Sequence, residues 1–253
     1  MAGIGSPPNS LKSRPGKLFL SRLVGVFVEP GETFEEIARN PGWLAPLVLL
    51  ILVALVFVET LLLKVGAREI VLHGLQQSGR AAGMDPAQMD HIAQTSAPFV
   101  RFLMPAGAAL GTPIFLLAVA GFGLLVLNGF FGQHAKFRDI FSVSCYAYLP
   151  GIVGVAMAMA VVLFGDPSAF NPQCPAPTNP GYFMNPLTSS RPVMALATSL
   201  DVIILWYLVL LAIGLSRVVR KRVKFGTIFS TYLGAWALVV IVKVGFAMLF
   251  AGH

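Results

Sequence analysis

Five long apolar blocks alternate with shorter polar segments along the chain. The blocks cover residues of about 44–63, 103–127, 140–164, 193–215 and 228–250. A bilayer core of about 30 Å needs about 20 apolar residues in a helix. Backbone groups in lipid must form their hydrogen bonds within the segment, as a helix does. The pattern therefore predicts an all-α membrane protein, in which residues 44–253 form a bundle of about five transmembrane helices.

The residues before the first block fall into two parts. Residues 1–16 are polar, which predicts a disordered tail. Within 17–43, the stretch LFLSRLVGVFV is apolar but too short to cross a bilayer, and this is typical of an interfacial amphipathic helix. We expect a turn at Pro30–Gly31 and a second short helix that ends before Pro41. Proline sterically disfavours the helical conformation for the residue before it.

Prolines and acidic residues predict finer features of the remaining chain. Asp85 is placed to cap a short helix that begins at Pro86, in the loop between the first two spans. Pro150 lies ten residues into the third span, where a missing amide donor should kink the helix. Residues 165–192 are rich in Pro, Asn and Gly, and we expect an irregular loop there.

Composition supports the membrane assignment. Hydrophobic residues make up 56% of the 253 residues and charged residues only 11%, whereas a soluble domain carries about 25% charged residues. The net charge of +7 follows from the excess of Lys and Arg in the cytoplasmic loops of membrane proteins. No basic folded module remains that would bind nucleic acid, so we expect no nucleic-acid partner.

The basic residues also predict the orientation. They concentrate before the first span, between the second and third spans, and between the fourth and fifth, where the segment SRVVRKRVK lies. These three regions share one side of the membrane. The bias places the N-terminus in the cytoplasm and the C-terminus outside. We expect the strongest basic loop to contact anionic lipids or a protein partner; its residues are Arg217, Arg220, Lys221, Arg222 and Lys224.

Three stretches resemble the Yip-one domain family of Ypt/Rab-interacting membrane proteins. They are VEPGETFEEIARNPGWLAPLVLL, NGFFGQHAKFRDIFSVSCYAYLP and LWYLVLLAIGLSRVVRKRVKFGTIFSTYLGAWAL, which extend over most of the chain. The resemblance implies five spans with a cytoplasmic N-terminus. Eukaryotic members act in vesicle traffic with Rab-type GTPases and carry long N-terminal regions. This chain looks more like the short prokaryotic members, which implies a prokaryotic cell (inner) membrane and does not imply Rab binding.

Three charged residues lie within the apolar blocks. Glu59, Asp201 and Lys243 fall at similar depths toward the outer side if the spans are helices of 1.5 Å per residue. Charges inside a membrane are expensive, so we predict an outer-leaflet cluster of these three side chains. Such a cluster is either an ion or proton site or a charge pair that fixes helix packing. Lys243 could instead extend its side chain to the outer headgroups.

Chemical motifs are absent from the sequence. It contains no P-loop, HExxH or GxSxG pattern, and its two cysteines, Cys145 and Cys174, form no metal-ligand spacing. We therefore expect no catalytic residue, cofactor or metal. The sequence favours a non-enzymatic membrane-organising or protein-interaction component, with other membrane proteins or further copies of itself as partners. The alternative is a small transporter or channel component that uses the cluster of Glu59, Asp201 and Lys243.

Overall fold

A computed structural model of the chain is entirely helical in its regular elements. It describes residues 19–77, 83–165, 171, 174–185, 188–220 and 222–249, and no strand occurs within these ranges. The predicted tail, 1–16, and Lys221 lie outside the described residues. Four helices are long and apolar enough to cross a membrane, and a bent helix pair makes a fifth when it is taken as one span. The predicted all-α membrane fold is thereby confirmed.

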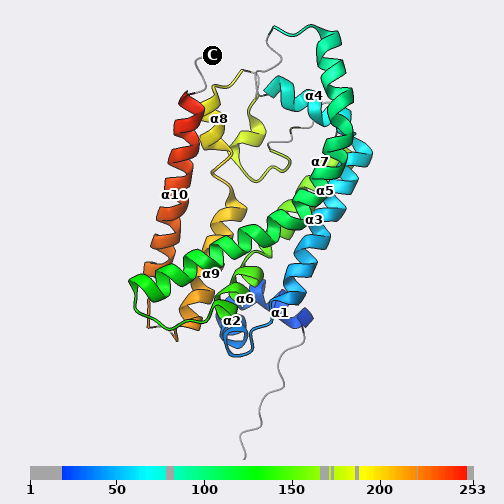
Figure 1. Ribbon diagram of the computed structural model, residues 1–253. Helices are drawn as coiled ribbons and strands as arrows, with labels where there is room; N and C mark the ends of the chain where they lie inside the picture. Colours follow the sequence, from blue (N-terminus) through cyan, green and yellow to red (C-terminus); the bar gives the residue numbers. More distant parts are fainter. Residues whose placement is uncertain are drawn as a thin grey trace, which may run out of the picture.

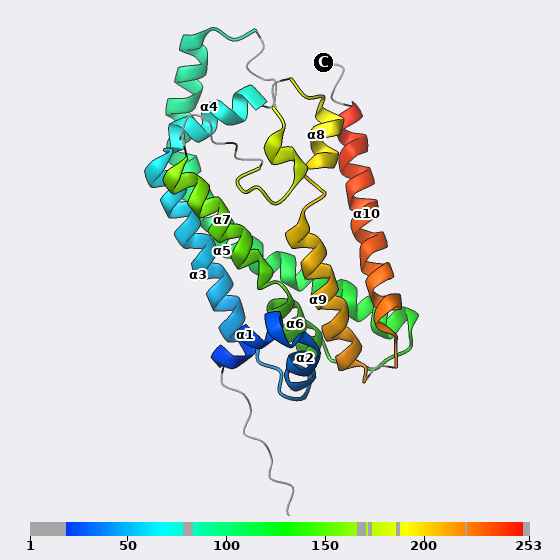
Figure 2. The same cartoon turned by 180° about the vertical axis from the view of Figure 1, so that it is seen from behind.

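Two short helices precede the first span. Helix α1 covers Phe19–Val28 and helix α2 covers Pro30–Arg39. The turn lies at Glu29, one residue earlier than the expected Pro30–Gly31, because proline with its fixed φ suits the first helical position. Both helices lie at one end of the bundle, where α2 packs beneath α6 and α9 and α1 lies beside them against α2 and α6 (Figures 1 and 2).

The first two spans are joined by α4. Helix α3 covers Leu44–Lys64, α4 covers Ala67–Gln77, and α5 covers Pro86–Leu124 before a π-helical turn, η1, at Leu125–Phe130. Asp85 caps α5 as expected, since its side chain accepts from the Gln88 amide and Gln88 accepts from the Asp85 amide.

The helix that starts at Pro86 is much longer than the sequence indicated. It does not stop before a separate span at residue 103 but continues through Pro98, Pro105 and Pro113 into that span, for 45 residues when η1 is included. At 1.5 Å per residue it is about 67 Å long, roughly twice the thickness of a bilayer core. Its first part runs along one side of the bundle, and its later part crosses the face of the bundle obliquely (Figure 1).

The third span is broken as predicted. Helix α6 covers Phe137–Ala147 and α7 covers Pro150–Phe164, with Pro150 at the first position of α7. Without an amide hydrogen, Pro150 cannot continue the hydrogen bonds of α6. The helix is interrupted at Pro150 as expected, although Phe137–Phe164 still counts as one candidate span.

The predicted fourth span, 193–215, is not one straight helix. The short 3₁₀ helix η3 covers Pro180–Phe183, and it is followed by α8 at Arg191–Ala197 and α9 at Val202–Val218. Helices α8 and α9 meet at an angle of 45°. The last span, α10, covers Phe225–Leu249.

The tightest packing lies at the end of the bundle that holds α1, α2, the α5–α6 connection and the α9–α10 connection, which we call the basic end. Fully buried side chains from α1, α2, α5, α6, α9 and α10 contribute to this cluster, including Phe34, Tyr146 and Leu215. Gly214 lets α9 approach closely, because a Cβ on it would lie 2.3 Å from Val143 and 2.8 Å from Phe34.

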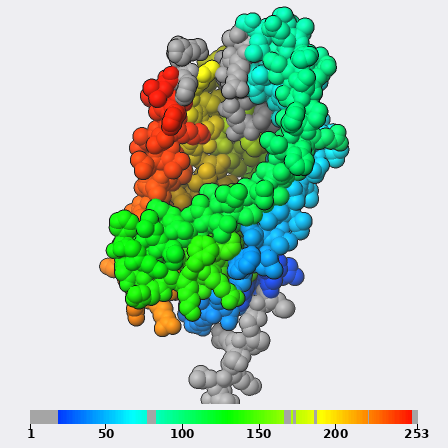
Figure 3. All heavy atoms as spheres, viewed as in Figure 1, coloured from blue at the N-terminus to red at the C-terminus, as the bar shows by residue number. Residues whose placement is uncertain are grey.

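Packing is looser at the opposite end. In Figure 3, α10 and the first half of α5 stand apart on the visible face, with α8 and α9 set back between them. The buried cluster there consists of Leu61 and Val162 with a few half-buried neighbours. Only 11% of the most apolar stretch of α10 is buried within the protein, so most of that helix faces lipid.

Candidate functional site

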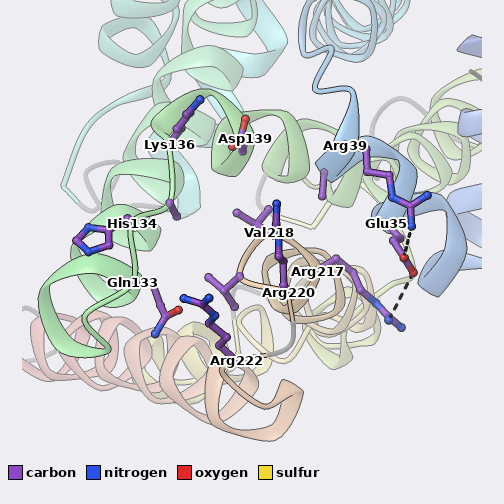
Figure 4. Close-up of a pocket in the computed structure, with 13 residues that line it drawn as sticks. Glu35, Arg39, Gln133, His134, Lys136, Asp139, Arg217, Val218, Arg220 and Arg222 are labelled. Atoms are coloured by element: carbon purple, nitrogen blue, oxygen red, sulfur yellow. Dashed lines mark hydrogen bonds and ion pairs between the residues drawn. The ribbon is translucent and has the colours of Figure 1, made fainter.

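The basic end contains an open cavity of about 870 Å³ (Figure 4). Three segments far apart in the sequence form its walls: the second half of α2, the α5–α6 connection, and the end of α9 with the residues that follow. We call it the basic cavity. Its lining residues are Glu35, Ala38, Arg39, Gln133, His134, Ala135, Lys136, Asp139, Arg217, Val218, Val219, Arg220 and Arg222.

The α2 wall supplies one of the two carboxylates of the cavity. Glu35 lies between two guanidinium groups, 2.6 Å from Arg39 Nη2 and 4.0 Å from Arg217 Nη1 (Figure 4). Because Arg39 and Glu35 are both exposed, this pair adds little to stability. Its effect is to hold two cations beside each other at the mouth of the cavity.

A second ion pair attaches α2 to α1. Arg22 on α1 donates to Glu36 at 3.1 Å and to the carbonyl of Asn40 at 3.1 Å. The side chains of Arg22 and Glu36 are only 12% and 19% exposed, so this contact is mostly shielded from water. On the other side of the α2–α3 connection, the Gly42 amide donates to Ser142 on α6 at 3.1 Å. These bonds attach α2 to both α1 and α6.

The end of α9 carries the basic residues that the sequence singled out. Arg217, Arg220 and Arg222 line the cavity, whereas Lys224 is exposed outside the lining. The backbone of Arg220 has a φ of 51°, in the left-handed region. Glycine is the usual residue there, and a side chain is strained in that conformation. Val223 is buried and holds the segment against the core.

Side-chain hydrogen bonds shape the α5–α6 connection. Asn128 donates to the carbonyl of Ala135 at 3.0 Å and accepts from the Ala135 amide at 2.9 Å. The Gln133 amide bonds to the carbonyl of Leu127 at 2.9 Å. Gly132 has a φ of 61°, which a residue with a Cβ rarely adopts. This closed loop presents Gln133 and His134 to the cavity.

The three intramembrane charges have separate partners. Lys243 on α10 donates to the hydroxyls of Thr198 at 2.9 Å and Ser199 at 3.1 Å. Asp201 accepts from Thr178 at 2.6 Å and from the Ile203 amide at 2.8 Å.

Lys243 and Asp201 therefore lie at the two sides of the break between α8 and α9. Asp201 caps the positive N-terminus of α9, and Lys243 lies beside the negative C-terminus of α8. Asp201 bonds a backbone amide at its helix end, whereas Lys243 bonds side-chain hydroxyls at the other. Glu59 is exposed on α3, which packs mainly against α5 and α7. No ion pair joins Lys243 to either carboxylate among the described residues. The three-residue cluster stays a prediction.

The cysteine at the opposite end of the bundle, Cys174, is buried. Cys174 is a free thiol and only 1% exposed. Burial raises the pKa of this thiol, the nearby charge of Lys243 lowers it by less, and Asp201 adds to the rise. Within the described residues, no group of three or more His, Cys, Asp and Glu side chains is placed to hold a metal ion.

Sequence reasoning found one wall of the basic cavity and missed the other two. Arg39 and Lys136 were not singled out, since nothing in a single sequence shows that they meet Arg217. The sequence held only an indirect indication that these two residues belong to the cavity. Both residues lie in stretches that carry the family resemblance, ahead of the first and third spans.

These features define a class of protein: a multi-pass α-helical membrane protein with a basic cavity at one end. Comparison with protein families matches residues 24–245 to the Yip1 domain, nearly the whole chain, and the protein belongs to this family. No curated protein and no solved structure is matched.

Proposed function

We propose that the protein is a non-enzymatic, membrane-organising component that gathers anionic lipid at its basic end. In this proposal the basic end faces the cytoplasm of a prokaryotic cell, with the C-terminus outside. The observation that carries it is the basic cavity, where five Lys and Arg side chains meet only two carboxylates; these are Arg39, Lys136, Arg217, Arg220, Arg222, Glu35 and Asp139.

The charge balance favours an anionic partner. Among the described residues, Lys136, Arg220 and Arg222 form no ion pair. A basic residue close to an anionic membrane surface contributes about 1 kcal/mol of attraction. The proposed orientation places these cations at the surface where anionic headgroups lie, and it agrees with the bias of basic residues toward the cytoplasmic side.

The position of the cavity also favours a lipid partner. Helix α1 presents exposed apolar side chains, including Leu20, Val24 and Val28, at the same end of the molecule. An amphipathic helix with such a face lies in the boundary between headgroups and acyl chains. The basic cavity would then be at the depth of the lipid headgroups.

The test is lipid retention by the reconstituted full-length protein. The wild type and an Arg220→Gln, Arg222→Gln variant are placed in nanodiscs with a mixture of anionic and zwitterionic lipids. Native mass spectrometry then measures which lipids stay bound to the protein when it is released from the nanodisc. We expect enrichment of anionic lipid that falls at least severalfold in the variant. The matched control is Lys64→Gln, Arg101→Gln, which removes two exposed cations outside the basic end. Equal losses in both variants would refute the proposal.

A further inference from the structure

The cations of the basic cavity exceed what one singly charged headgroup neutralises. Glu35 is shared between Arg39 and Arg217, and Asp139 is the second carboxylate of the lining. After both carboxylates are counted against the five cations, about three positive charges remain. A phosphate diester, with one charge, would leave most of this excess in place. A phosphate monoester carries about −1.5 to −2 at pH 7 and three acceptor oxygens.

The start of α6 adds a second feature that suits an anion. Lys136 occupies the N-cap position of α6 and lines the cavity. A lysine side chain has no acceptor, so α6 has no side-chain cap. In its first turn the Asp139 amide bonds to the carbonyl of Lys136 at 3.1 Å. Helix N-termini with free amides and a positive dipole end bind phosphate groups.

Arg217 supplies a donor without an acceptor. Its side chain is 22% exposed, and its Nε atom is buried and finds no hydrogen-bond partner among the described residues. A buried donor without a partner destabilises the protein. That atom lies beneath the cavity surface, so a ligand would contact the exposed part of the Arg217 side chain that lines the cavity.

Arg220 is held in position by a strained backbone. Its left-handed conformation follows the last turn of α9, and its amide bonds to the carbonyl of Arg217 at 3.0 Å. The amide of Arg222 bonds to Val219 at 3.0 Å. The turn thus presents two arginines to one cavity, and arginine forms paired hydrogen bonds with phosphate oxygens.

We infer that the basic cavity is a selective site for a phosphate monoester group, bound between the arginines at the end of α9 and the N-terminus of α6. This inference rests on the proposed function and narrows it from anionic lipid in general to one headgroup chemistry. The group can come from a membrane lipid with a terminal phosphate or from a soluble phosphate ester. A volume of about 870 Å³ leaves room for more than the phosphate itself.

The test compares two lipids that differ in this group alone. Nanodiscs contain the full-length protein and equal amounts of phosphatidic acid, a monoester, and phosphatidylglycerol, a diester, with identical acyl chains. We expect phosphatidic acid to be retained about tenfold more than phosphatidylglycerol. The preference should fall to near unity in Arg217→Gln and in Arg222→Gln, the latter being exposed and outside the core. Lys64→Gln should leave it unchanged.

A second arm separates lipid from soluble sources. Glycerol 3-phosphate is added to nanodiscs that contain phosphatidic acid, with glycerol as the control. If micromolar glycerol 3-phosphate displaces phosphatidic acid, the monoester site is supported and is assigned to soluble ligands. If phosphatidic acid stays bound at millimolar glycerol 3-phosphate, the site is supported and is assigned to lipid.

Two results would overturn the inference, and they can be told apart. If both anionic lipids are retained equally and both are lost in the arginine variants, the monoester site is wrong while the proposed function stands. If neither is retained above zwitterionic lipid, both proposals fail.

Discussion

Gly214→Ala should destabilise the protein, although alanine is the better helix former. The new Cβ would lie 2.3 Å from Val143 Cγ1 and 2.8 Å from Phe34 Cδ1, where ordinary contacts measure 3.4–4 Å. Neither neighbour can yield easily, because Phe34 and Val143 are fully buried. Overpacking of this kind costs about 1–3 kcal/mol, and replacing a helical glycine returns up to about 1 kcal/mol.

The net loss should be about 1–2 kcal/mol, which is about 2–8 °C in melting temperature for a chain of this size. The assay is thermal unfolding of the purified protein in one detergent, followed by circular dichroism. Gly234→Ala on α10 is the control, since a Cβ there meets nothing within 4 Å. It should melt at the wild-type temperature or slightly above.

A double variant tests the assigned cause. Val143→Ala removes the methyl group nearest to the new Cβ, so Gly214→Ala should cost less in that background than in the wild type. The reasoning is refuted if Gly214→Ala and Gly234→Ala have the same melting temperature. It is also refuted if Gly214→Ala lowers the melting temperature as much in the Val143→Ala background as in the wild type.

Four other substitutions or treatments test separate contacts. Arg22→Met removes the mostly buried pair with Glu36 and should lower the free energy of unfolding by about 1.5–3 kcal/mol, measured by denaturant titration. Asn128→Ala leaves two backbone groups unpaired, and it should reduce anionic-lipid retention in nanodiscs as well as stability. Asp201→Ala should cost about 0.5–2 kcal/mol through loss of the α9 cap, and Asp201→Asn less, in the same titration. Cys174 should react with maleimide only after unfolding, as peptide mass spectrometry would show, and rapid labelling of the folded protein would contradict its burial.

Sequence patterns predicted the helices well where the signal is local. Apolar blocks of about 20 residues have few alternatives to a helix in lipid. Asp85 and Pro150 act on their own neighbours, so their effects as cap and as kink could be predicted from single residues.

The helix break before α9 was missed because the average apolarity of 193–215 hides it. The polar run at Thr198, Ser199 and Asp201 is only a few residues long, yet it supplies the hydroxyls and the carboxylate at the break. Helix ends need such partners, so a polar run inside an apolar block is the signal to look for.

The basic cavity needed tertiary information. The basic run that follows α9 is visible in the sequence, but Arg39 and Lys136 meet it only after α2 and α6 pack against α9. That packing depends on close contacts such as the one at Gly214, which a single glycine among 25 does not reveal.

The uneven distribution of the core makes the bilayer part of this protein's structure. Fully buried side chains hold the basic end together within the chain itself. At the opposite end α10 contributes little buried surface, so lipid acyl chains occupy the positions that neighbouring helices fill elsewhere. One end is held in shape by contacts within the chain, whereas the other exposes apolar helix surface that a bilayer would cover. A change in bilayer thickness should therefore alter the loosely packed end more than the basic end.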